Sequence, residues 1–174
     1  MTGFSVFSRL QVSQTLRKLQ PQRCTQMTNR GLPHFAQGKV VKGFGRGSKE
    51  LGIPTANFDE DVVGNLPEET EPGVYFGFAQ IENGPIYKMV MSVGWNPFYK
   101  NTKKSMETYI IHKFDEDFYG KILKVVMLGY LRSEKDFKSV EDLIQAINND
   151  VLEAQTKLDE EQFAKYKCDH FFTS

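Results

Sequence analysis

Hydrophobic residues alternate with polar or small residues in several short runs along the middle of the chain, which is the pattern of half-buried β-strands. The runs are 38–42, 74–81, 87–93, 106–114 and 121–130. The dipeptide Asn83-Gly84 separates the second run from the third and is a strong hairpin signal, so we expect these two strands to pair antiparallel. No helical pattern lies between the runs, whereas parallel strands need long crossovers. The pattern therefore predicts an antiparallel barrel or sandwich.

One stretch near the C-terminal end has helical periodicity instead. Its apolar residues recur at spacings of three and four, namely Val140, Leu143, Ile144, Ile147, Val151, Ala154 and Leu158. Ser139 and Asp142 form a capping pair at its start. We expect this stripe to pack as core against one side or one end of the barrel. The polar segment 59–72 predicts a surface loop, and Phe171 and Phe172 of the tail are expected to dock on the barrel.

Composition separates the first 33 residues from the rest. Residues 1–33 are basic and contain no acidic residue, the first being Glu50. This composition occurs in mitochondrial presequences and equally in disordered tails, and both interpretations stay open. Residues 34–174 are long and apolar enough for one domain with a sizeable core, which predicts the barrel with its C-terminal helix. We expect no second full domain, and so no separate adenylyltransferase domain that would make FAD.

Charge and cysteine content limit the classes of partner and compartment. The chain has 22 Lys and Arg against 22 Asp and Glu, so its formal net charge is zero and it has no general attraction for nucleic acid or membranes. No apolar run reaches the length of a bilayer span. Cys24 and Cys168 are too far apart in the sequence to suggest a disulfide framework. A reducing compartment, and hence the cytoplasm, is the expected location.

The candidate chemistry is concentrated in residues 43–57. Four glycines and two basic residues precede a Pro-Thr-Ala-Asn turn, so exposed N–H groups and positive charge converge as a polyphosphate ligand requires. The order Gly-Ser-Lys excludes a P-loop, and the third glycine of a dinucleotide fingerprint is missing. The glycines alone fit an ordinary turn equally well. Thr55 and Asn57 favour a ligand site, because two neutral oxygens at a step of two can face a Mg²⁺ that phosphates hold.

Four blocks of sequence carry a family resemblance. They are Gly43-Phe44-Gly45-Arg46-Gly47, Leu51-Gly52-Ile53-Pro54-Thr55-Ala56-Asn57, Trp95-Asn96-Pro97 and Met106-Glu107-Thr108. In order and spacing they resemble the eukaryotic riboflavin kinases, over about residues 34–172. With the strand pattern, the resemblance predicts a mainly β fold: a six-stranded antiparallel Greek-key-like β-barrel with a C-terminal α-helix. It implies a monomeric enzyme that transfers the γ-phosphoryl group of ATP to the riboflavin 5′-hydroxyl to give FMN, with Mg²⁺ or Zn²⁺, and that needs neither nucleic acid nor membrane.

The resemblance also implies roles for individual residues. Glu107 would be the general base, and its place among apolar neighbours after a lysine-rich loop suits that role, although a solvated surface glutamate has the same pattern. The ATP-binding residues would be Gly43, Lys49, Thr55, Ile110, His112 and Tyr119. Thr55 and Asn57 would hold the metal. The flavin-binding residues would be Arg132, Lys135 and Phe137, which without the resemblance look like a charged connector before the helix.

Two other functions stay open on the residues alone. The first is a barrel that binds single-stranded nucleic acid through a basic aromatic loop. The residues that favour it are Phe98, Tyr99, Lys100, Lys103 and Lys104, and the balanced charge of the chain argues against it. The second is a flavin-binding protein without kinase activity, which would use the same pocket. A lone histidine such as His112 is also more often structural than ligand-binding.

Overall fold

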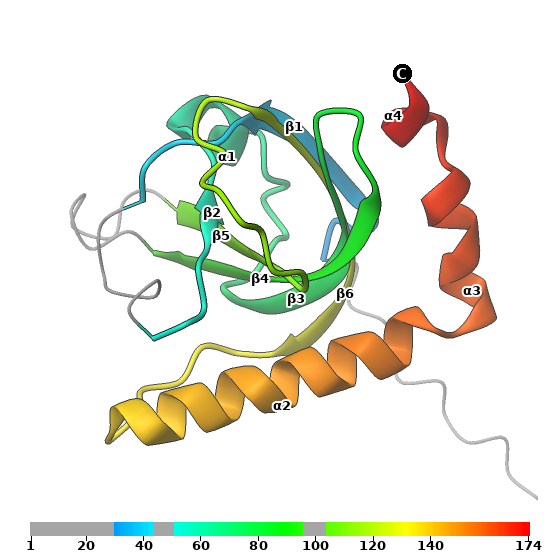
Figure 1. Cartoon of the computed structure of the whole chain (residues 1–174). Coiled ribbons are helices and arrows are strands. Elements are labelled where there is room, and N and C mark those ends of the chain that lie inside the picture. Colours follow the sequence, from blue (N-terminus) through cyan, green and yellow to red (C-terminus); the bar gives the residue numbers. More distant parts are fainter. Residues whose placement is uncertain (1–29, 44–50, 96–103) are drawn as a thin grey trace, which may run out of the picture.

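A computed structural model describes residues 30–43, 51–95 and 104–174 of the chain (Figure 1). Its strands are β1 (His34–Lys39), β2 (Ala56–Asn57), β3 (Gly73–Ile81), β4 (Ile86–Trp95), β5 (Lys104–Ile110) and β6 (Ile122–Arg132). Its helices are α1 (Glu60–Gly64), α2 (Val140–Leu158), α3 (Glu161–Ala164), the 3₁₀-helix η2 (Lys165–Cys168) and α4 (His170–Thr173). None of the helices in these ranges is long and apolar enough to cross a membrane.

The six strands form one antiparallel sheet in the order β1-β6-β3-β4-β5-β2. Strands β3, β4 and β5 are consecutive neighbours, and β6 returns to lie beside β3, which is a Greek key. The sheet curls into a half-barrel (Figure 1). An isolated bridge between Val41 and Asn57, with a hydrogen bond of 2.9 Å from the Val41 N–H to the Asn57 carbonyl, joins the chain after β1 to β2 at the other edge. The predicted mainly β, Greek-key fold is confirmed.

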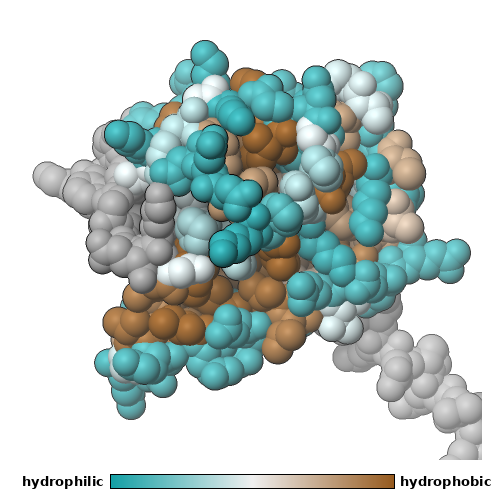
Figure 2. Space-filling model, in the orientation of Figure 1, coloured by the Kyte–Doolittle hydropathy of each residue, from teal (hydrophilic) through white to brown (hydrophobic). Residues whose placement is uncertain are grey.

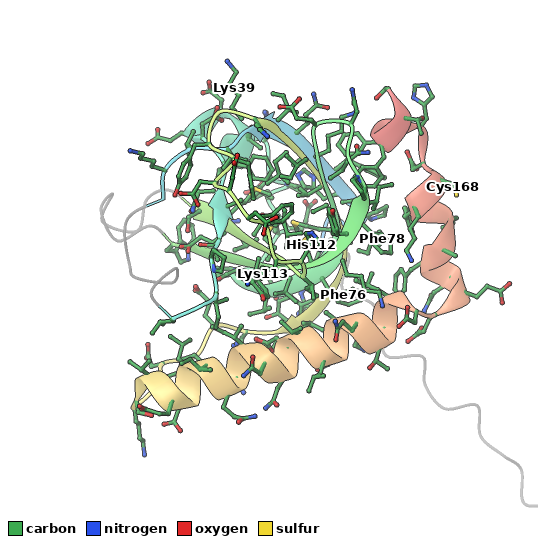
Figure 3. All side chains as sticks on the ribbon, viewed as in Figure 1. Lys39, Phe76, Phe78, His112, Lys113 and Cys168 are labelled. Carbon is green, nitrogen blue, oxygen red and sulfur yellow. The ribbon has the colours of Figure 1, made fainter. Side chains whose placement is uncertain are left out.

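Both faces of the sheet are apolar over much of their area, because the strands alternate between an inner and an outer cluster. The inner cluster includes Tyr75, Met89, Met91, Val93, Met106, Leu123, Val125 and Met127. The outer cluster includes Phe76, Phe78, Val90, Val126, Ala154, Leu158 and Phe172. Figure 3 shows Phe76 and Phe78 on the side of the sheet that faces the C-terminal helices. The outer face is therefore a packing surface wherever these helices cover it.

Helix α2 has the predicted bounds and cap, and the Ser139 hydroxyl accepts a 3.1 Å hydrogen bond from the Asp142 N–H. Its C-terminal half buries Ala154 and Leu158 on the sheet. At that end Lys88 of β4 forms a 2.7 Å ion pair with Asp159, and this hydrogen bond lowers the pKa of the Asp159 carboxyl. The N-terminal half departs from the prediction of a uniform core stripe.

The apolar residues of that N-terminal half stay accessible. Val140 is 49% exposed, and Leu143, Ile144 and Ile147 are only half-buried. In Figure 2 a brown surface follows this half of α2 where it faces the barrel. The sheet therefore covers this apolar face of α2 only in part.

The aromatic tail docks as predicted. Phe172 is 3% exposed, and the Phe171 ring lies edge-on to Phe35 of β1 at 5.1 Å between centroids. The buried Lys124 ammonium donates a 2.6 Å hydrogen bond to the carbonyl of Ser174. Helices α3 and α4 and the η2 turn therefore cover the outer face beside β1 and β6.

Several strand boundaries differ from the sequence prediction. The first strand spans 34–39 instead of 38–42, because the Val40 N–H bonds to Lys121 and the Val41 N–H has already turned to Asn57. The strand predicted for 106–114 ends at Ile110, since the His112 N–H bonds back to the Ile110 carbonyl at 2.7 Å in a tight turn. The last strand continues to residue 132 through register shifts opposite β3.

The acidic segment 59–72 contains the short helix α1 and is not only a loop. The Asp59 side chain accepts a 3.1 Å hydrogen bond from the Val62 N–H, and Val63 is buried in the inner cluster.

Packing also begins before the predicted boundary at residue 34. Arg30 forms a 3.0 Å ion pair with Glu71, and its guanidinium lies 3.8 Å from the centre of the Tyr130 ring.

Candidate functional site

A single row of residues crosses five strands on the outer face of the sheet. Asn57 of β2 lies opposite Glu107 of β5, and Glu107 lies opposite Ser92 of β4. Ser92 lies opposite Val74 of β3, which in turn lies opposite Arg132 of β6. Directly opposed residues of antiparallel strands point to the same face. The row therefore brings a predicted metal ligand, the predicted base and a predicted flavin-binding residue to one side of the barrel.

The row lies where the helical cover of the outer face ends. The neighbouring row, which contains Val90 and Tyr109, belongs to the cluster that packs with α2 and the tail. Ser92, two residues further along β4, is exposed, and Glu107 is half-buried. On the far side of the row, a Cβ atom at Gly94 would collide with a carboxylate oxygen of Glu134. The row is thus an accessible strip between α2 and the Glu134 side chain.

The predicted metal ligand Asn57 is packed against glycine backbone. A Cβ atom at Gly43 would collide with the amide nitrogen of Asn57 and would lie 3.0 Å from its Cγ, so only glycine allows this approach. Asn57 is 7% exposed, and Thr55, two residues before it, is half-buried. The structure thus places Gly43, Asn57 and Glu107 together. Lys49 lies outside the described residues.

The other residues predicted to bind ATP occupy the end of the barrel after β5. The Ile110 side chain is 4% exposed in the inner core, so only its backbone is available to a ligand. The His112 ring is stacked on Tyr87 at 4.3 Å and meets Phe114 edge-on at 4.9 Å (Figure 3). Tyr119 is 48% exposed.

A backbone bond places the turn that carries Tyr119 near the glycine segment. The Gly120 N–H donates a 2.8 Å hydrogen bond to the carbonyl of Val40, three residues before Gly43. The turn and the start of the glycine segment therefore leave the barrel at the same end. His112 is structural in its ring packing, while its exposure leaves an edge of the ring open to a ligand.

Two of the three predicted flavin-binding residues are in contact. The Arg132 guanidinium lies 5.8 Å from the centre of the Phe137 ring, and it forms two hydrogen bonds with the Asp150 carboxylate on α2, at 2.8 and 2.6 Å. Lys135 is exposed on the connector between them. Arg132 and Phe137 lie together between β6 and α2, and the flavin-binding role of all three residues stays a prediction.

Sequence reasoning missed Ser92, Asp150 and Glu134. Asp150 left a signal, because it interrupts the apolar stripe of α2 between Ile147 and Ala154, and a charged residue there needs a buried partner. Ser92 lies between the inward positions Met91 and Val93, which places it outward, but only the register shows that it is opposite Glu107. Glu134 left no signal in its spacing.

The described residues contain no group of three or more His, Cys, Asp or Glu side chains that could hold a metal ion. The candidate ligands are instead the neutral oxygens of Thr55 and Asn57.

Of the residues that favoured nucleic-acid binding, Lys104 donates a 2.6 Å hydrogen bond to the Thr70 carbonyl. The other four, at positions 98, 99, 100 and 103, lie outside the described ranges.

The chain is similar to known proteins over most of its length. The family model described as flavokinase, riboflavin kinase, matches residues 30–158. The riboflavin kinases of Mus musculus and Homo sapiens are each 59% identical over 143 residues, which is 82% of this chain and 92% of each relative. The crystal structure of riboflavin kinase from Trypanosoma brucei superposes with a TM-score of 0.66 at 30% identity, covering 80% of this chain and 88% of that one. The chain belongs to the riboflavin kinase family.

Proposed function

We propose that this protein phosphorylates the 5′-hydroxyl of riboflavin with ATP and releases FMN and ADP. The observation that carries the proposal is the outer-face row, because it aligns Asn57, Glu107 and Arg132 on one face of the sheet. Family membership supports the same reaction. Phosphoryl transfer to an alcohol needs a phosphate cradle, a cation and a base for the hydroxyl proton, and the row provides candidates for the last two.

The direction of the row supports one orientation of riboflavin in this proposal. Glu107 and Arg132 are three strand steps apart, or about 14 Å at the usual strand spacing. The 5′-hydroxyl at the end of the ribityl chain must lie at Glu107, so the chain runs past Ser92 and the ring system lies toward Arg132. The Phe137 ring and the accessible apolar face of α2, formed by Val140, Leu143, Ile144 and Ile147, would then provide a wall for the flat ring system.

The residues near Gly43 fit a divalent cation that phosphates hold. Neutral oxygens are ligands that Mg²⁺ accepts beside phosphates and water, whereas Zn²⁺ prefers thiolate and imidazole, so we propose Mg²⁺. Thr55 and Asn57 would hold it, and the close packing of Gly43 against the Asn57 amide would keep the Asn57 side chain in position. When bound, the cation would neutralise charge on the ATP phosphates.

Glu107 acts as the general base in this proposal. Its carboxylate accepts the proton of the riboflavin 5′-hydroxyl while the oxygen forms a bond to the γ-phosphorus and the bond from that phosphorus to the β,γ-bridging oxygen breaks. ADP leaves with the electrons of the broken bond. The pairing of half-buried Glu107 with Asn57, the proposed metal ligand, supports this role.

The test is to incubate the purified protein with riboflavin, ATP and Mg²⁺, with Zn²⁺ in a parallel series, and to separate the flavins by chromatography. FMN should accumulate with time and with ATP, and fastest with Mg²⁺. A folded protein that binds riboflavin but forms no FMN with either metal would overturn the kinase assignment. That result would favour a flavin-binding protein without phosphotransfer.

A further inference from the structure

The contact between Arg132 and Asp150 joins the last strand to the helix beside the flavin strip. The Nε and Nη2 atoms of Arg132 donate hydrogen bonds of 2.8 and 2.6 Å to the two oxygens of Asp150. Such paired bonds fix the plane of the guanidinium as well as its position. Asp150 is 6% exposed, and it lies near the middle of α2, between the covered half of the helix and the half that faces the strip.

Stability alone is a weak reason for this buried pair. Removing two charges from water is costly, and apolar residues of similar size often stabilise a fold equally well. The neighbouring buried positions of α2, Ala154 and Leu158, are apolar and already attach the helix to the sheet. A charge at position 150 is therefore better explained by what it does to Arg132.

The other contacts of Arg132 leave a defined part of the cation for a ligand. Nη1 donates a 3.1 Å hydrogen bond to the Ser133 carbonyl, and the Phe137 ring lies 5.8 Å from Cζ. A guanidinium has five N–H donors, and these contacts with those to Asp150 use three of them. Two N–H groups remain, in a plane that the protein has fixed.

We propose that Asp150 is the positioning residue for Arg132, and that it aims the two remaining N–H groups at the carbonyl oxygens of the flavin ring. The inference rests on the proposed function for the identity of the ligand. We assign the ring and not the product phosphate as the partner of Arg132. In the proposed reaction the phosphate lies beside Glu107, which is three strands away from Arg132. Asp150 itself need not touch the flavin.

The test variant is Asp150→Asn, which keeps the size of the side chain but replaces one acceptor oxygen with an amide. The KM for riboflavin should rise by about tenfold or more, while kcat and the KM for ATP stay within about twofold, because only the ring contact is misplaced. The matched control is Asp159→Asn, which removes a second ion pair, between Lys88 of the sheet and the residue that caps the end of α2, at 2.7 Å. It should leave the KM for riboflavin unchanged.

A double variant separates positioning from a general effect on the fold. If Asp150 acts through Arg132, then Arg132→Ala and Arg132→Ala/Asp150→Asn should have the same KM for riboflavin. The proposal would be overturned if the double variant showed the sum of the two single effects on the free energy of riboflavin binding. It would also be overturned if Asp150→Asn had a normal KM for riboflavin while Arg132→Ala raised it.

Direct binding of lumiflavin, which has the ring carbonyls but neither ribityl chain nor phosphate, separates this inference from the kinase assignment. Quenching of flavin fluorescence should show weaker lumiflavin binding to Asp150→Asn than to the wild type, by about the same factor as for riboflavin. This result would support the inference even for a protein that forms no FMN. Equal lumiflavin affinity in the two proteins would overturn it.

Discussion

Asn57 and Glu107 face each other across β2 and β5, and they are the only directly paired polar side chains that β2 offers, because its other residue, Ala56, lies opposite Thr108 inside the barrel. The two-residue strand thus has one role on each face. Its inner residue completes the core, and its outer residue stands beside the proposed base.

Replacing Glu107 with Gln should lower kcat by about a hundredfold or more, because the amide cannot accept the hydroxyl proton. Binding of ATP, measured by calorimetry, should change little. Glu153→Gln is the control, since Glu153 is an exposed glutamate of α2 paired with Lys157. A kcat close to that of the wild type in Glu107→Gln would remove Glu107 from the mechanism.

Replacing Gly43 with Ala should weaken ATP binding and raise the Mg²⁺ concentration needed for half-maximal activity. The added Cβ would collide with the Asn57 amide nitrogen and displace a proposed metal ligand. Gly64→Ala is the control, because a Cβ there meets no atom within 4 Å. A normal Mg²⁺ titration in Gly43→Ala would place the metal elsewhere.

Replacing Ser92 with Leu should lower kcat/KM for riboflavin by about tenfold or more, because the larger side chain would occupy the strip between Glu107 and Val74. Thermal stability should change little, since Ser92 is exposed. Gln37→Leu adds the same side chain at an exposed position of β1 and should leave the kinetics unchanged. If both variants behave alike, the ribityl chain does not run past Ser92.

The stability of the barrel should fall in weak acid through His34. Burial lowers the pKa of His34 from its usual 6.5, and its Nε2 atom has no hydrogen-bond partner in the described part of the chain. His34 therefore binds a proton more readily in the unfolded chain than in the folded one. The contribution of neutral His34 to the free energy of unfolding is intact above pH 6.5, the usual pKa of histidine, and is lost as the pH falls below that value.

Thermal melts of the wild type and His34→Leu at about pH 5 and about pH 8 would measure this effect. The melting temperature should fall further from about pH 8 to about pH 5 in the wild type than in His34→Leu. His170→Leu, at an exposed position of α4, should behave like the wild type. An equal loss in all three proteins would show that other groups dominate the acid response.

The elements with local signals were predictable from the sequence. Asn83-Gly84 located the hairpin between β3 and β4, and Ser139 with the apolar stripe gave the bounds of α2. These features depend on residues close together in the chain, where turn chemistry and periodicity decide the structure. The short helix α1 was missed because five residues are too few to show a period.

The candidate site was predictable only in part, because it depends on register between distant strands. The sequence blocks identified Glu107 and Asn57 one at a time, and nothing local shows that they are opposite each other. The partner of Arg132 was missed for the same reason, since Asp150 reaches it from the helix and not from the adjacent strand. Strand pairing and helix docking are set by the whole core, which no short window contains.

The Greek-key order of the strands has a consequence for the timing of folding. The row from Asn57 to Arg132 draws on β2, β5, β4, β3 and β6, so it is complete only after the chain has been made through β6 and has formed its long-range pairings. Contacts between residues so far apart in sequence form slowly, because loop closure comes before any compensating contact. Recovery of enzyme activity during refolding should therefore follow closure of the barrel and lag behind formation of the β3–β4 hairpin, whose pairing is local.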